Sequence, residues 1–152
     1  MEVERVKRFI DGADEATIQA VEEYIKKKKY PKGPVVLEIP YKFPSLNEYI
    51  NACRRTPYAG ATMKKNVQRD IGYFINKLPK FEHPVIIDFT WVEKNGRRDP
   101  DNVTYAKKFI LDAMVECGKL KDDNRKNVIG FKDKTIYDDE WKTILEIREV
   151  EQ

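Results

Sequence analysis

The chain is poor in the side chains that most often bind transition metals. Its 152 residues include one histidine, His83, and two cysteines, Cys53 and Cys117. Such a supply excludes a zinc cluster of His and Cys, and it argues against catalysis that relies on several histidines. A bound metal would therefore have carboxylate ligands, which favours Mg²⁺, with Mn²⁺ as the alternative. Because the two cysteines are far apart in sequence, we expect free thiols and a reducing, cytoplasmic location.

Long apolar runs are also missing. No stretch approaches the roughly 20 apolar residues that cross a bilayer. Charged residues begin at Glu2, so we expect no signal peptide and no membrane partner. With 41% hydrophobic and 36% charged residues, the composition is typical of a soluble protein. A chain of this length is expected to form one domain with a substantial core.

Two familiar binding motifs are absent as well. No GxxxxGK[ST] sequence occurs, which excludes the phosphate-binding loop of the common NTPases. A calcium-binding EF-hand needs glycine at its sixth position. Counting from Asp99 the sixth residue is Thr104, and counting from Asp122 it is Asn127.

Positive charge, by contrast, is clustered. The formal net charge is only +3, yet lysine and arginine occur in blocks. These blocks are residues 26–32, Arg54-Arg55, Lys64-Lys65, Arg97-Arg98 and Lys107-Lys108. Such blocks suit a partner with a phosphate backbone, although similar pairs also occur on solvated surfaces that bind nothing.

Hydrophobic periodicity predicts an α+β fold. Helical spacing occurs in residues 1–10, 14–29, 61–78 and 100–117, and strand-like patterns occur in residues 35–39, 85–92, 128–136 and 141–150. We expect residues 34–152 to form a single domain, with a mixed sheet of about four strands and helices packed on it. Residues 1–33 would be an N-terminal helical extension.

The segment from Arg97 to Asp123 carries the most informative pattern. Six apolar residues follow the rhythm of one buried helix face: Val103, Ala106, Ile110, Ala113, Met114 and Cys117. Gly118 comes directly after them, where a left-handed C-terminal cap is wanted. Pro100 suits the first helical position and favours an extended backbone at Asp99, which makes Asp99 the natural N-cap.

The acids of this helix have two interpretations. Asp99 and Asp101 could be an ordinary cap and a first-turn acid that complements the helix dipole. Alternatively they belong to a binding site, because Lys108 and Asp112 share with Asp101 the helix face opposite the apolar one. We interpret Asp112 as an acid that pairs with a nearby lysine or supports the metal ligands from behind.

Phosphodiester hydrolysis accounts for this combination of residues. The reaction needs an activated water and relief of the charge that builds on the phosphate, and divalent ions held by carboxylates supply both. On an extended backbone Asp99 and Asp101 would point the same way, about 6.6 Å apart. Asp123, or its neighbour Asp122, would complete the metal site. Lys108 or Lys107 would stabilise the transition state.

A second polar group follows the first expected strand. Asn47, Arg54 and Arg55 could present phosphate-binding donors, and ordinary turn or helix-cap chemistry is the alternative. Together with residues of the acidic segment and the helix before it, they form the predicted nucleic-acid surface: Asn47, Arg54, Arg55, Lys64, Arg97, Arg98, Asn102 and Lys107.

These motifs together resemble the RusA family of endodeoxyribonucleases, the Holliday-junction resolvases carried by phages and prophages. The resembling motifs are Pro44-Ser45-Leu46-Asn47 with Arg54-Arg55, then Arg98-Asp99-Pro100-Asp101-Asn102, then Lys108, Leu111-Asp112-Ala113-Met114, Gly118 and Asp122-Asp123. The resemblance implies that Asp99, Asp101 and Asp123 are essential carboxylates that bind Mg²⁺. It implies that Lys108 is the essential lysine. It also implies a homodimer that makes paired symmetric nicks in a four-way DNA junction.

The chain departs from the family pattern in two places. Additional residues separate Asp101 from the lysine, so both Lys107 and Lys108 remain candidates, and Lys108 keeps the family's distance to Asp112. The segment before Val35 has no counterpart in the family. Two other functions are compatible with the sequence. One is a basic nucleic-acid-binding protein without catalysis, and the other is a Mg²⁺-dependent nuclease acting on flaps or RNA.

Overall fold

The computed structural model describes residues 14–29 and 33–150, and the chain divides into two compact units at Gly33–Pro34. In the first unit, helix α2 (Glu15–Lys29) follows Asp14, whose carboxylate accepts a 2.8 Å hydrogen bond from the amide of Thr17. Hydrogen bonding by Thr17 lowers the pKa of Asp14. The helix starts where the sequence predicts. The helix predicted in residues 1–10 lies outside the described residues.

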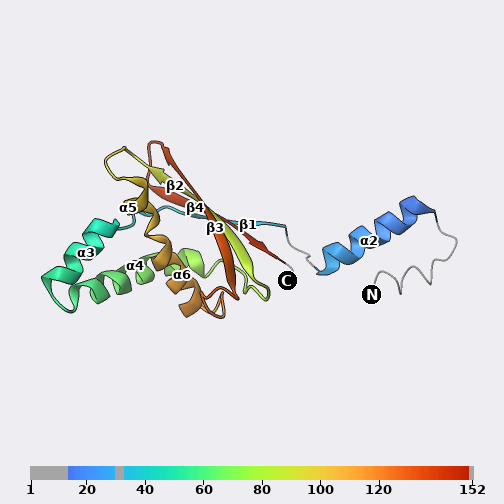
Figure 1. Ribbon diagram of the computed structural model, residues 1–152, viewed down its shortest axis with the longest axis horizontal. Helices are drawn as coiled ribbons and strands as arrows, with labels where there is room; N and C mark the ends of the chain where they lie inside the picture. The colour runs from blue at the N-terminus through green and yellow to red at the C-terminus, as the bar shows by residue number, and fades with distance from the viewer. Residues whose placement is uncertain (1–13, 30–32, 151–152) are drawn as a thin grey trace. The chain divides into compact units, whose positions relative to one another are not determined.

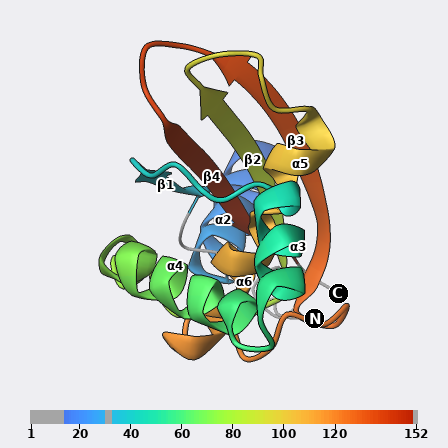
Figure 2. The ribbon, with the colours of Figure 1, turned by 90° about the vertical axis from the view of Figure 1, so that its left-hand side faces the viewer.

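The second unit is built on a four-stranded sheet with the order β1-β4-β2-β3 (Figure 2). Its strands are β1 (Val35–Ile39), β2 (Val85–Glu93), β3 (Val128–Tyr137) and β4 (Lys142–Glu149). Strand β4 runs antiparallel to β1 and β2, whereas β2 and β3 are parallel. A parallel pair needs a long crossover connection. Residues 94–127 form that crossover and carry the acidic segment.

Four helices pack on this sheet (Figure 1): α3 (Leu46–Arg55), α4 (Ala59–Ile75), α5 (Pro100–Thr104) and α6 (Lys107–Glu116). Alternate residues of the central strands are buried beneath them, among them Phe89 and Trp91 of β2 and Leu145 of β4. Ile110 and Met114 of α6 are fully buried against this layer. The predicted α+β class and mixed sheet are confirmed. Among the described residues, no helix is long and apolar enough to span a bilayer.

The helix predicted from Asp99 to Cys117 is in fact two helices. Between α5 and α6 the amides of Ala106, Lys108 and Phe109 bond to carbonyls three residues back rather than four. This tighter turn shifts the register without interrupting the apolar rhythm. Gly118 follows α6 with a φ of 73°, so its predicted left-handed cap conformation is confirmed.

Candidate functional site

Asp99 occupies the N-cap position of α5 without capping it. Its backbone is extended, with φ −68° and ψ 152°, and Pro100 follows at the first helical position, as the sequence predicts. The Asp99 carboxylate, however, makes no capping hydrogen bond and is exposed. Asp101, in the first turn of α5, is also exposed. Within the described residues neither carboxylate has a hydrogen-bonding or ion-pair partner. The interpretation of Asp99 as a plain cap therefore loses its main support.

A buried ion pair, the Glu93–Arg98 pair, fixes the loop that carries Asp99. The Arg98 guanidinium donates to both carboxylate oxygens of Glu93, at 2.7 and 2.8 Å, and to the carbonyl of Phe43 at 2.6 Å. Its carbon lies 5.2 Å from the ring centre of Trp141. Glu93 is only 5% exposed. This geometry ties the β2–α5 loop to β2 and to the β1–α3 loop. Arg98, predicted to contact nucleic acid, is thus engaged inside the protein.

Four side chains of alternating charge form a lysine–aspartate chain, namely Lys64, Asp112, Lys108 and Asp123. The Lys108 ammonium lies 2.9 Å from Asp123 Oδ2 and 3.1 Å from Asp112 Oδ1. Lys64 of α4 approaches Asp112 Oδ2 to 2.7 Å, but outside hydrogen-bonding geometry, so their contact is electrostatic. Asp112 therefore pairs with nearby lysines, as one of its two interpretations held. This lysine–aspartate chain connects α4, α6 and the loop after α6.

The lysine–aspartate chain sets the charge of its members. The hydrogen bond from Lys108 holds the pKa of Asp123 below its ordinary value, and the bonds to Asp123 and Asp112 raise the pKa of Lys108. Lys108 therefore stays protonated at neutral pH. Its side chain is still 53% exposed, so the ammonium is held in place and remains accessible to an anion.

Lys107 and Lys108, the two lysine candidates, have different environments. Lys107 Nζ pairs with Asp133 of β3 and lies 4.6 Å from the ring centre of Phe131. Asp133 also accepts a 3.0 Å hydrogen bond from Trp91 Nε1. Lys107 therefore anchors α6 to the sheet. Of these two lysines, only Lys108 contacts Asp112 and Asp123.

The two acids at the end of the segment also differ. The Asp122 carboxylate accepts hydrogen bonds from the amide of Asp123 at 2.8 Å and from the side chain of Asn124 at 3.0 Å. Asp122 thus shapes its own loop, whereas Asp123 faces Lys108. The choice between Asp122 and Asp123 as a metal ligand stays a prediction.

The remaining predicted contacts are scattered over the surface. Arg54 and Arg55 are exposed in the last turn of α3, and Asn47 is exposed near its start. Arg97 is exposed beside the partly buried Arg98, and Asn102 is half-buried in α5. Lys64 belongs to the lysine–aspartate chain. Among the described residues, no hydrogen bond or ion pair joins any two of these eight residues. Their role stays a prediction.

The predicted set of three metal ligands is not assembled in the described residues. No three or more His, Cys, Asp or Glu side chains there come together in a way that could hold a metal ion. Asp123 is bonded to Lys108 instead. Asp99 and Asp101 do offer unpartnered carboxylate oxygens, and Mg²⁺ is commonly held by one or two carboxylates with water and substrate phosphates. The fit to Mg²⁺ thus rests on this pair, and Asp123 as a third ligand stays a prediction.

Sequence reasoning missed the acids that hold the bases. Glu93 and Asp133 were not singled out, yet they engage Arg98 and Lys107. Glu93 had a usable signal, because it ends an apolar strand five residues before an arginine, across a Lys94-Asn95-Gly96 turn. Asp133 had none, since the β2–β3 pairing that brings it under α6 joins residues far apart in sequence.

No family model matches the chain, and a search of curated proteins finds no match either. The resemblance to the RusA family therefore rests on the motifs themselves.

Proposed function

We propose that the protein is a Mg²⁺-dependent endodeoxyribonuclease that cleaves branched DNA, with the four-way junction as its substrate. One observation carries the proposal. Asp99 and Asp101 have free carboxylates, whereas Asp112, Asp122 and Asp123 all have protein partners. Asp99 at the N-cap and Asp101 in the first turn of α5 are exposed and separated only by Pro100, so both carboxylates are available to a divalent cation.

The division of roles follows from the geometry. When bound, Mg²⁺ would activate water and offset charge on the phosphate. Asp99 and Asp101 would hold it, and the Glu93–Arg98 pair would keep their loop in place. Asp112 and Asp123 orient the Lys108 ammonium, which would stabilise negative charge on the scissile phosphate.

Paired nicks need two active sites, so the proposal includes a homodimer. A two-fold dimer matches the two-fold symmetry of a four-way junction. A reducing, cytoplasmic setting fits as well, because Cys53 and Cys117 are both free thiols.

A DNA-binding protein without catalysis is the main rival. It is favoured by the lack of an assembled three-acid metal site among the described residues. Its binding would fall steeply with salt and would not respond to Mg²⁺.

Incubation of the protein with a synthetic four-way junction and Mg²⁺ separates the two functions. The proposal expects paired nicks, which are lost in Asp99→Asn and in Asp101→Asn while junction binding remains. Asp139→Asn, at an exposed acid of the β3–β4 turn, serves as the matched control and should cut normally. Binding without any cut, unchanged by all three variants, would leave only the rival.

A further inference from the structure

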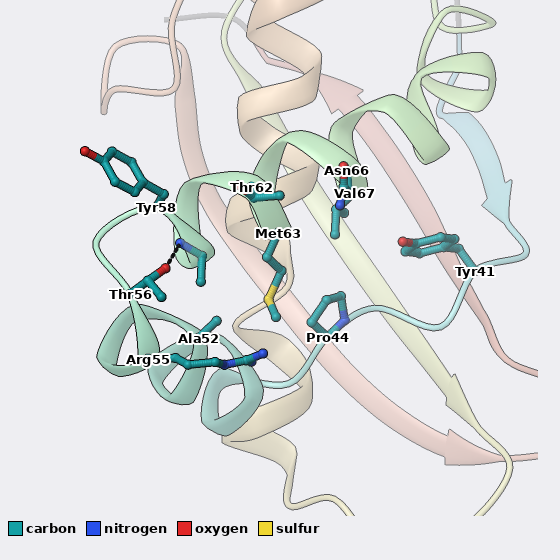
Figure 3. A pocket seen from close by; sticks show the side chains of 11 residues that line it. Tyr41, Pro44, Ala52, Arg55, Thr56, Tyr58, Thr62, Met63, Asn66 and Val67 are labelled. Atoms are coloured by element: carbon teal, nitrogen blue, oxygen red, sulfur yellow. Dashed lines mark hydrogen bonds between the residues drawn. The ribbon is translucent and has the colours of Figure 1, made fainter.

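A hollow of about 450 Å³ opens between the β1–α3 loop, α3 and α4 (Figure 3). We call it the α3–α4 hollow. Its main walls are Tyr41, Pro44, Arg55, Tyr58, Met63 and Asn66. The volume lies within the range of roughly 300–1,000 Å³ that is typical of small-ligand sites. The mechanism proposed above uses none of these walls.

The hollow is formed in advance by the packing of its helices. A methyl group at Gly60 of α4 would lie 2.4 Å from the Cys53 sulfur, so any larger residue at this position would force the Cys53 side chain to move. The Thr56 hydroxyl accepts a 3.0 Å hydrogen bond from the amide of Ala59 and thereby fixes the turn between the helices. These contacts determine the shape of the hollow without a ligand.

The Tyr41 wall is also fixed and uncharged. Its hydroxyl donates a 3.0 Å hydrogen bond to Asp70. Burial and this bond raise the pKa of Tyr41 to about 12, so the phenol stays neutral under ordinary conditions.

The lining combines an apolar patch with two free polar groups. Met63 and Pro44 face each other across the hollow, and the Arg55 side chain extends toward them from α3 (Figure 3). Arg55 makes no ion pair with the described residues, and the exposed Asn66 amide has no partner there. Such a lining suits a flat, apolar ring with hydrogen-bonding edges that carries a phosphate. Tyr58 stands at the rim, 77% exposed, with its ring directed away from the other walls.

Helix α4 contributes residues to both the hollow and the lysine–aspartate chain. Met63 lines the hollow, and the next residue, Lys64, contacts Asp112 of the lysine–aspartate chain. Neighbouring α-carbons are about 3.8 Å apart. The same turn of α4 therefore supplies a residue to the hollow and a residue to the lysine–aspartate chain.

We propose that the α3–α4 hollow receives one nucleotide that is extruded from its base pair at a DNA branch point. Its base would lie against Met63 and Pro44, its phosphate would bind Arg55, and Tyr58 would stack on the neighbouring base. A base pair at a branch point lacks part of the stacking present in a continuous duplex, so its base costs less to extrude and this pocket favours branched over linear DNA. This proposal rests on the proposed function, because it says where one strand of that site's DNA substrate would bind.

Equilibrium binding without divalent ions tests the proposal independently of cleavage. Each DNA carries 2-aminopurine, either at the branch point of a four-way junction or within a linear duplex. The affinity ratio of junction to duplex is the readout. Met63→Trp fills the hollow and Arg55→Gln removes its guanidinium. We expect each to lower the ratio about tenfold, since contacts to a single base are worth that much.

Matched variants define the background. Tyr73→Ala removes a similarly exposed tyrosine of α4, 70% exposed and outside the hollow, and should leave the ratio unchanged. Arg54→Gln removes the neighbouring arginine and should weaken both DNAs equally. If Met63→Trp and Arg55→Gln also weaken both DNAs equally, the proposal is overturned. It is overturned too if free deoxyadenosine monophosphate competes as well as the junction does, since the hollow would then be a mononucleotide site.

The two proposals can fail separately. A wild-type protein that never cuts with Mg²⁺ but loses its junction preference in Met63→Trp would disprove the nuclease and keep the hollow. If both hollow variants cut normally and keep the affinity ratio unchanged, the nuclease proposal stands and the hollow proposal is disproved.

Discussion

The two ends of the β2–β3 crossover carry similar residues in opposite electrostatic states. At the first end, before α5, Arg98 forms an ion pair with Glu93, and Asp99 and Asp101 have no ion-pair partner among the described residues. At the second end Lys108 lies between Asp112 and Asp123, so the acids there are neutralised within the protein. The acids of the first end therefore have no paired cation, whereas the second end holds an oriented ammonium.

This difference shows why a count of acids and bases is a poor guide to a site. Arginine next to the acidic pair suggests local neutralisation, but burial directs it to a different acid. What matters is which charges stay unpartnered after folding. Among the described residues, the two carboxylates at the start of α5 are such charges.

The largest expected effect concerns the Glu93–Arg98 pair. Glu93→Ala leaves a buried guanidinium without its counter-charge, and we expect it to lower the free energy of unfolding by about 3–5 kcal/mol. Glu140→Ala, which breaks the more exposed pair with Lys142, should cost far less. Urea denaturation measures both.

A paired replacement sharpens this test. Glu93→Met with Arg98→Met removes both charges and should recover much of the lost stability. Equal losses for Glu93→Ala and Glu140→Ala would show that the Glu93–Arg98 pair does not fix the loop of Asp99.

The second effect separates the adjacent lysines. Lys108→Met removes the ammonium held at the acids, and we expect cleavage of the junction to slow by about 100- to 1,000-fold. Lys107→Met breaks an anchor to Asp133 and should lower stability more than the cleavage rate. Single-turnover rates at saturating protein, with thermal unfolding of both variants, distinguish the two. The opposite ranking would assign the catalytic role to Lys107.

The smallest effect is a change in titration at the second end. Lys108 lowers the pKa of Asp123, so the carboxylate adds stability above its ordinary pKa of 3.8. That contribution is lost as the pH falls through the lowered, folded-state value. In Lys108→Met the Asp123 pKa should rise toward the ordinary value, which carboxyl-carbon NMR titration measures. Identical titration curves in both proteins would mean that the two side chains do not pair in solution.

The sequence predicted the fold better than the details of the site. Strand-like patterns located all four strands, and Asp14 and Gly118 located a helix start and a helix end. The break between α5 and α6 was missed, because the tighter hydrogen bonds at Ala106 keep the same residues buried. Apolar periodicity reports burial and does not detect such a change of helix type.

Pairing across the fold was the part that sequence could not supply. The lysine–aspartate contact between Lys108 and Asp112 is local, at four residues, and was foreseeable. The contacts of Lys64 with Asp112 and of Lys107 with Asp133 depend on how α4 and β3 pack against α6. The hollow likewise depends on the close approach of Gly60 to Cys53.

The central claim is that Asp99 and Asp101 bind a divalent cation. Binding of Mn²⁺ followed by NMR tests it most directly. Paramagnetic broadening of the backbone amides should be strongest around residues 99–101. It should disappear in the double variant Asp99→Asn, Asp101→Asn. Broadening that is unchanged in the double variant, or centred on the acids of the β3–β4 turn, would contradict the claim.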